Sequence, residues 1–85
     1  MNLKAEILEL FGSTEDILFA DGHDDAIIGF EPNLWKVVYS RNKIINGLVK
    51  DGMSENEAME YADYNIFAAM VGDKTPIWVE DFNWT

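Results

Sequence analysis

The segment from Asp21 to Asp25 carries side chains that could bind a cation. It includes the only histidine of the chain, His23, between carboxylates. Carboxylate oxygens and imidazole are metal ligands, and the Asp-Gly alternation resembles the start of a calcium loop. A hydrophobic run begins at Ala26, where such a loop needs further oxygen donors. A solvated turn is therefore the simpler interpretation, and a metal site at Asp21, His23, Asp24 and Asp25 is the alternative.

Three acidic side chains could bind a basic protein surface. Glu57, Glu60 and Asp63 lie in a segment whose apolar spacing predicts a helix, and we expect them on its exposed side. Carboxylates on a rigid helix attract basic groups and can imitate the phosphates of DNA. Acidic residues on a helix are more commonly a solvated surface. Protein binding, DNA mimicry and simple solvation therefore stay open.

Aromatic residues are concentrated near the end of the chain. One helix stripe and one strand cannot bury all of them on a single side, so we expect some at the surface. Exposed Tyr and Trp side chains commonly anchor protein interfaces, including self-association, although core filling is their commoner use. We predict that Tyr64, Trp78 and Trp84 contribute to binding. The aromatic residues of this region are Tyr61, Tyr64, Phe67, Trp78, Phe82 and Trp84.

No arrangement of residues indicates catalysis. The chain contains no cysteine, which excludes disulfides, thiolate zinc sites and a thiol nucleophile. The single histidine has no evident nucleophile beside it, and no Gly-rich phosphate loop follows an expected strand. We therefore predict a protein that is not an enzyme and needs no cofactor.

The charge distribution favours a basic partner. The net charge is −10, and residues 36–50 hold four basic and no acidic side chains between two strongly acidic segments. A field of this sign repels nucleic-acid phosphates, so we expect no direct nucleic-acid binding. We also expect no membrane contact, because no apolar run reaches the length of a membrane span. The length of 85 residues and hydrophobic content of 48% predict one domain, residues 1–85.

Hydrophobic periodicity and turn signals predict the elements that position these residues. We expect helices over residues 3–11 and 41–50, the second capped by Ser40. Ser54 and Glu57 form a capping box that starts a third helix, which should extend to about Val71 and bury Ala69 and Met70. Strands are expected over residues 17–20, 26–30, 35–39 and 75–80. This predicts an α+β domain of order αβββααβ, with a mostly antiparallel sheet of three or four strands and three helices.

Five phrases of the sequence occur in order within residues 17–80. They are Asp21-Gly22-x-Asp24-Asp25-Ala26-Ile27-Ile28-Gly29, Val38-Tyr39, Gly52-Met53-Ser54-x-x-Glu57-Ala58-x-x-Tyr61, Tyr64-Asn65-Ile66 and Val71-Gly72-x-Lys74-Thr75-Pro76-Ile77. Together they resemble a family of small acidic proteins of tailed bacteriophages to which no activity is assigned. The resemblance implies a phage gene product in the cytoplasm of the infected bacterium.

Together these observations predict an acidic accessory protein that binds and modulates or inhibits a bacterial host protein with a basic surface. A nucleic-acid-handling or defence enzyme is one class of target that such charge suits. The alternatives are a small metal-binding protein or enzyme at residues 21–25, and a homo-oligomeric assembly accessory, with a homodimer as its simplest form. The predicted binding residues are Glu57, Glu60, Asp63, Tyr64, Trp78 and Trp84.

Overall fold

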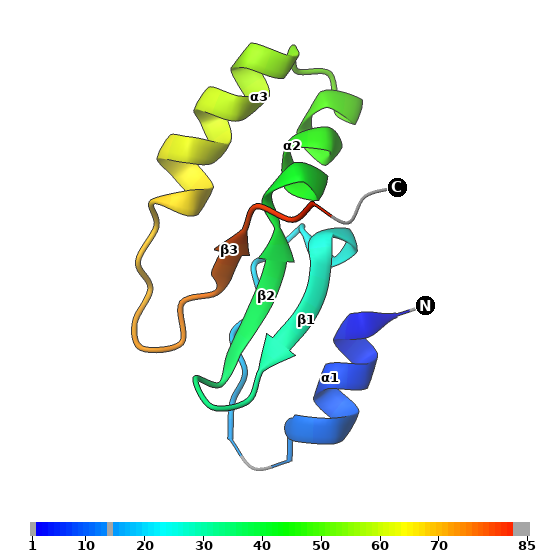
Figure 1. Ribbon diagram of the computed structural model, residues 1–85, viewed down its shortest axis with the longest axis vertical. Helices are drawn as coiled ribbons and strands as arrows, with labels where there is room; N and C mark the ends of the chain where they lie inside the picture. Colours follow the sequence, from blue (N-terminus) through cyan, green and yellow to red (C-terminus); the bar gives the residue numbers. More distant parts are fainter. Residues whose placement is uncertain (1, 14, 83–85) are drawn as a thin grey trace.

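A computed structural model describes residues 2–13 and 15–82, so Trp84 lies outside the described residues. In the described part the chain forms an α+β arrangement of three α-helices and a three-stranded sheet (Figure 1). The elements in chain order are α1 (Leu3–Phe11), a 3₁₀ turn (Asp24–Ala26), β1 (Ile27–Glu31), β2 (Lys36–Ser40), α2 (Arg41–Lys50), α3 (Glu55–Ala62), a π-helical turn (Asp63–Phe67) and β3 (Ile77–Val79).

The sheet is mixed and has the order β1-β2-β3. β1 and β2 form an antiparallel hairpin, whereas β3 lies parallel to β2 with Trp78 opposite Tyr39. The expected mostly antiparallel sheet is therefore only partly confirmed. The chain between β2 and β3 contains both α2 and α3. Two parallel strands need such a crossover connection, because the chain must return to the end of the sheet where β2 begins before β3 can start.

The prediction of a strand over residues 17–20 is wrong. This segment forms no regular secondary structure and pairs with no strand within the described residues. It packs against the core, and the N–H of Ala20 donates to the Tyr39 hydroxyl oxygen at 2.6 Å. Its apolar residues thus cover the sheet face to which Tyr39 points instead of extending the sheet edge. Of the three strands expected before residue 40, only the second and third form, and they pair as one hairpin.

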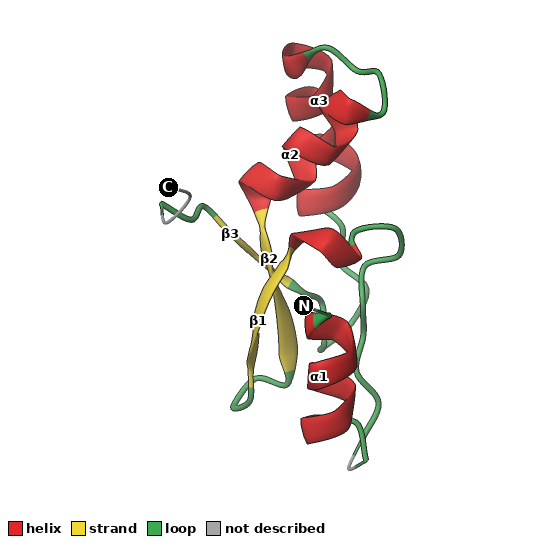
Figure 2. Cartoon of the chain, turned by 90° about the vertical axis from the view of Figure 1, so that its right-hand side faces the viewer, coloured by secondary structure: helices red, strands yellow, loops and turns green. Residues whose placement is uncertain are grey.

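The core lies between the sheet and the helices. Val37 and Tyr39 of β2 are completely buried. Figure 2 shows that α1 lies against one face of the sheet, while α2 and α3 extend beyond the end of β2. Phe11 of α1 stacks on Phe30 of β1, with ring centroids 4.6 Å apart. The buried hydrophobic residues are Ile7, Ala26, Ile27, Val37, Tyr39, Ile44, Leu48, Ala58, Ala62 and Ile66.

The third helix is shorter than expected. It is α-helical only to Ala62 and then widens into a π-helical turn that ends at Phe67. Ala58, Ala62 and Ile66 are buried, but Ala69 and Met70 are exposed. Their predicted burial is wrong because the segment after Phe67 leaves the helix and carries these side chains away from the core.

The connection between α2 and α3 is set by local hydrogen bonds. Gly52 has a φ of 117°, and its N–H donates to the Val49 carbonyl while the Met53 N–H donates to the Leu48 carbonyl. This pair of bonds is a Schellman motif, which needs the left-handed conformation that glycine adopts readily. The predicted capping box follows at once, with Ser54 Oγ accepting from the Glu57 N–H at 3.2 Å.

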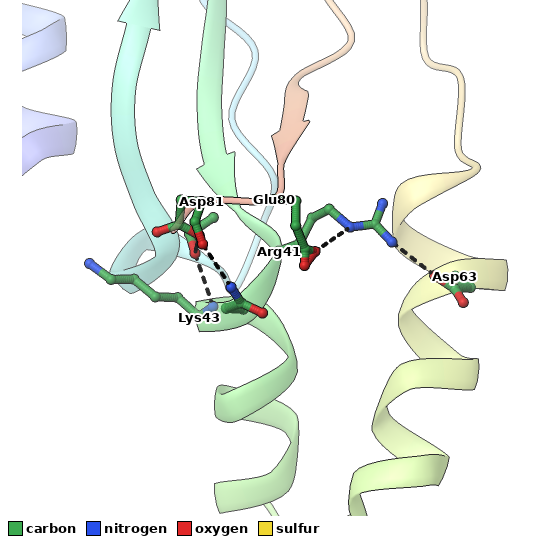
Figure 3. A network of polar contacts seen from close by, with 7 residues as sticks. Arg41, Lys43, Asp63, Glu80 and Asp81 are labelled. Atoms are coloured by element: carbon green, nitrogen blue, oxygen red, sulfur yellow. Dashed lines mark hydrogen bonds and ion pairs between the residues drawn. The ribbon is translucent and has the colours of Figure 1, made fainter. Parts of the chain in front are cut away.

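The junction between β2 and α2 also fixes the end of β3. Ser40 is completely buried, and its Oγ accepts from the Lys43 N–H at 3.1 Å as the predicted N-cap. The same hydroxyl donates to Asp81 Oδ1 at 2.6 Å, and Asn42 Nδ2 donates to the Asp81 carbonyl oxygen at 3.1 Å (Figure 3). One side chain therefore caps a helix and binds the segment that follows β3.

Ser40→Ala is expected to lower the free energy of unfolding by about 1–2 kcal/mol, because it removes a helix cap and a hydrogen-bond donor to a carboxylate. Urea denaturation followed by circular dichroism measures this loss. Asn42→Ala is the control, since it removes a different hydrogen bond to Asp81 and leaves the cap intact. Equal losses in the two variants would contradict the double role of Ser40.

Ser54→Ala is expected to cost about 1 kcal/mol of folding free energy, since the Glu57 N–H loses its side-chain acceptor. Thermal and urea unfolding of the variant would show it. A double-mutant cycle with Glu57→Ala separates the reciprocal bonds of the capping box from the effect of either side chain alone. Wild-type stability of Ser54→Ala would show that the cap does not hold the helix start.

Candidate functional site

A shallow groove of about 370 Å³ runs along α3 and into the π-helical turn. Glu57, Glu60, Tyr61 and Tyr64 are spaced at i, i+3, i+4 and i+7, which places them on one side of the helix. Two of them are acidic and two aromatic, so the groove combines negative charge with ring surfaces. We call it the acidic groove, and it is lined by Met53, Glu57, Glu60, Tyr61, Tyr64 and Asn65.

The carboxylate of Glu57 is held in place by the helix start. Its Oε1 accepts from the Ser54 N–H at 3.0 Å. The bond from the Ser54 backbone, with a further contribution from the Ser54 hydroxyl, lowers the pKa of Glu57. A lowered pKa means that the group stays ionised to a lower pH than an ordinary glutamate does. Glu57 therefore supplies a fixed negative charge at one end of the groove at neutral pH.

The tyrosines of the groove are open to solvent. Tyr64 is 81% exposed and Tyr61 is 44% exposed. Asn65 Nδ2 donates to the Tyr61 carbonyl oxygen at 3.1 Å, which ties the π-helical turn to the last turn of α3. Exposed tyrosines on a rigid helix offer large contact surfaces at small entropic cost, because each ring has only two rotatable side-chain bonds.

Asp63 does not line the acidic groove. Its Oδ1 lies 3.3 Å from Arg41 Nη2, and Arg41 Nε lies 3.7 Å from Glu80 Oε1 (Figure 3). The Arg41 guanidinium also lies over the Phe67 ring, 4.1 Å from its centroid. The structure therefore separates Asp63 from Glu57 and Glu60 and gives its charge an intramolecular partner.

The Trp78 side chain packs mainly against aromatic rings of the interior. Its ring centroid lies 5.2 Å from that of Tyr39 and 5.7 Å from that of Phe67. Of the six predicted binding residues, Glu57, Glu60 and Tyr64 meet in the acidic groove, whereas Asp63 and Trp78 lie elsewhere and Trp84 is outside the described residues. Sequence reasoning did not assign Met53, Tyr61 or Asn65 to this site. Helical spacing from Glu57 was the signal that would have added Tyr61.

The side chains of residues 21–25 do not converge. Asp24 pairs with Lys4 at 3.5 Å. Asp21 and His23 line one hollow, whereas His23 and Asp25 line another that also contains Lys43 and Lys50. Among residues 2–13 and 15–82, no three His, Asp or Glu side chains are grouped so that they could hold a metal ion. The arrangement does not favour the metal-binding alternative.

No family model matches this chain, and no curated protein or solved structure was found to be similar to it. Within the described residues, no helix is both long and apolar enough to cross a membrane.

Arg41→Lys is expected to lower the free energy of unfolding by about 0.5–1 kcal/mol although the charge is kept, because an ammonium group cannot reproduce planar stacking on Phe67 together with two carboxylate contacts. Thermal unfolding at low and high salt measures it. Asp63→Asn is the control, since it weakens only one partly exposed ion pair and should change stability less. A larger loss in Asp63→Asn would contradict stacking as the main contribution of Arg41.

Proposed function

We propose that this chain is a phage-like accessory protein that binds a bacterial host protein through the acidic groove and modulates or inhibits it. The observation that carries the proposal is the meeting of two carboxylates and two exposed tyrosines on one side of α3 and the π-helical turn that follows it. The cytoplasm of the infected bacterium is the proposed place of action. A nucleic-acid-handling or defence enzyme is the proposed class of target, because such proteins carry basic surfaces.

A basic side chain from the partner suits this groove. Lys or Arg would be attracted by the carboxylates of Glu57 and Glu60, and a guanidinium could stack on Tyr61 or Tyr64. Aromatic and arginine contacts are frequent energetic centres of protein interfaces. The net charge of −10 would also steer a basic partner toward the molecule before contact.

Recognition of a protein surface fits the groove better than mimicry of DNA. A mimic presents a row of carboxylates that replace successive phosphates. Here Glu57 is bonded to Ser54 and Asp63 is paired with Arg41, so two of the three predicted acids make intramolecular contacts. The remaining surface mixes charge with tyrosine rings, as protein interfaces do.

Self-association is the second candidate, and a specific observation favours it. Residues 68–71 are four consecutive exposed apolar residues, and exposed apolar runs of this kind are usually explained by a contact. Mutual repulsion of two chains with charge −10 opposes a homodimer at low salt.

The test is affinity capture of host proteins from bacterial lysate by the immobilised chain, compared with Glu60→Lys. The expected result is a captured basic protein whose affinity falls about tenfold or more in the variant, because charge complementarity at the groove is reversed. Capture should also weaken between about 0.1 M and 1 M salt, as the Debye length shrinks from about 10 to 3 Å.

Glu9→Lys is the matched control for this experiment. It makes the same change of charge at an exposed position of α1, at the other end of the molecule from α3 (Figure 1). The proposal fails if Glu60→Lys captures as well as the wild type, or if both variants lose capture equally. Displacement of the captured protein by duplex DNA would favour mimicry, and a dimer in sedimentation equilibrium would favour self-association.

A further inference from the structure

A second hollow, of about 300 Å³, opens beside the acidic groove. Its volume is at the lower end of the range, about 300–1,000 Å³, that small-ligand pockets occupy. Asn65 lines both hollows, so they share a wall. We call the second hollow the apolar pocket, since most of its lining is hydrophobic: Leu18, Phe19, Ile66, Ala69, Val71 and Trp78.

The inner wall of the apolar pocket belongs to the core. The bond between Tyr39 and the Ala20 N–H fixes the segment that carries Leu18 and Phe19. Burial is the main cause that raises the pKa of Tyr39, so its hydroxyl stays protonated at neutral pH. Trp78 packs on Tyr39 and closes the inner wall. The pocket is therefore formed before any ligand binds.

The outer wall is an exposed apolar loop that is nevertheless braced. Val71 is 60% exposed, yet its N–H donates to Thr75 Oγ1 at 2.9 Å. The same hydroxyl donates to the Gly72 carbonyl oxygen at 2.7 Å, and Thr75 is only 8% exposed. A buried threonine thus holds apolar side chains at the surface in a defined position, which is unfavourable in water unless another molecule covers them.

The π-helical turn joins the two hollows. Tyr64 lines the acidic groove, Ile66 lines the apolar pocket and Asn65 lies between them. π-helical turns occur frequently at functional sites, because the widened turn redirects side chains. This turn presents an aromatic contact and an apolar contact on neighbouring surfaces within three residues.

We propose that the apolar pocket accepts a large apolar side chain, of the Leu or Phe type, from the same partner segment whose basic side chain occupies the acidic groove. This inference rests on the proposed function and specifies its partner as a segment with a Lys or Arg close to an apolar anchor. The net charge of −10 bears on the class of occupant, because it repels anionic apolar ligands such as fatty acids. The titratable side chains that line the pocket are Asp21 and His23.

The test uses three blocked synthetic peptides and nuclear magnetic resonance. One peptide carries an Arg and a Leu joined by a short Gly/Ser spacer of varied length, and the other two replace either the Leu or the Arg by Ser. Amide shifts should map the Arg to the acidic groove and the Leu to the apolar pocket. The peptide with both anchors should bind about tenfold or more tightly than either peptide with one, because the second contact becomes intramolecular.

Two variants with the same change of charge compare the wall of the apolar pocket with a neighbouring position outside it. Val71→Glu places a charge at the wall of the apolar pocket and should remove the gain from Leu. Met70→Glu makes the same change at the neighbouring position, which is 82% exposed and does not line the pocket, and should keep that gain. The Arg-only peptide should bind Val71→Glu as tightly as it binds Met70→Glu, because both variants add the same charge. Both positions are exposed, so neither variant should unfold the protein, and circular dichroism verifies this.

The outcomes separate this inference from the proposed function. Binding of Arg at the acidic groove with no gain from Leu, or equal effects of Val71→Glu and Met70→Glu, would overturn the shared apolar anchor and leave the proposed function standing. Binding of Leu alone, with no shift at the acidic groove for any peptide, would overturn the groove as the cation site and with it the paired recognition. Absence of shifts at both hollows up to millimolar peptide would overturn both.

Discussion

The hydroxyl of Ser40 is the contact on which the arrangement of the molecule depends. It accepts from the first turn of α2 and donates to Asp81, so a single buried side chain joins the end of β2, the start of α2 and the chain after β3. A buried hydroxyl with both of its bonds made adds stability, whereas one with a missing partner would cost it. The parallel position of β3 beside β2 follows from this tie together with the sheet hydrogen bonds.

The binding surface depends on the same junction. Arg41, next in the chain, lies against Phe67 and between Asp63 and Glu80, which relates the π-helical turn to β3. β3 in turn places Trp78 on Tyr39 and so completes the inner wall of the apolar pocket. The acidic groove is set more locally, by the capping box and by helical spacing. The apolar pocket is thus a product of tertiary packing, whereas the acidic groove depends mainly on a single helix.

The acidic groove and the apolar pocket contribute different interactions to the proposed recognition of a partner. Long-range attraction comes from the uneven negative charge, and salt weakens it. Contact energy comes from tyrosine rings and apolar side chains, and salt does not weaken that contribution. A partner with only positive charge would be steered but held weakly, and one with only apolar groups would meet no steering. The proposed partner, with a basic residue near an apolar anchor, would use both.

The sequence by itself determined what depends on neighbouring residues: the Ser40 cap, the capping box of Ser54 and Glu57, and the exposed position of Glu57 and Glu60 on the third helix. These features rest on hydrogen bonds and spacings within a few positions, which residue types specify directly. Only the tertiary structure decided that residues 17–20 cover the sheet, that β3 runs parallel to β2, that Asp63 pairs with Arg41, and that the third helix widens after Ala62. Each of these depends on contacts between distant segments, where an apolar run serves equally well as a strand or as a cover for one.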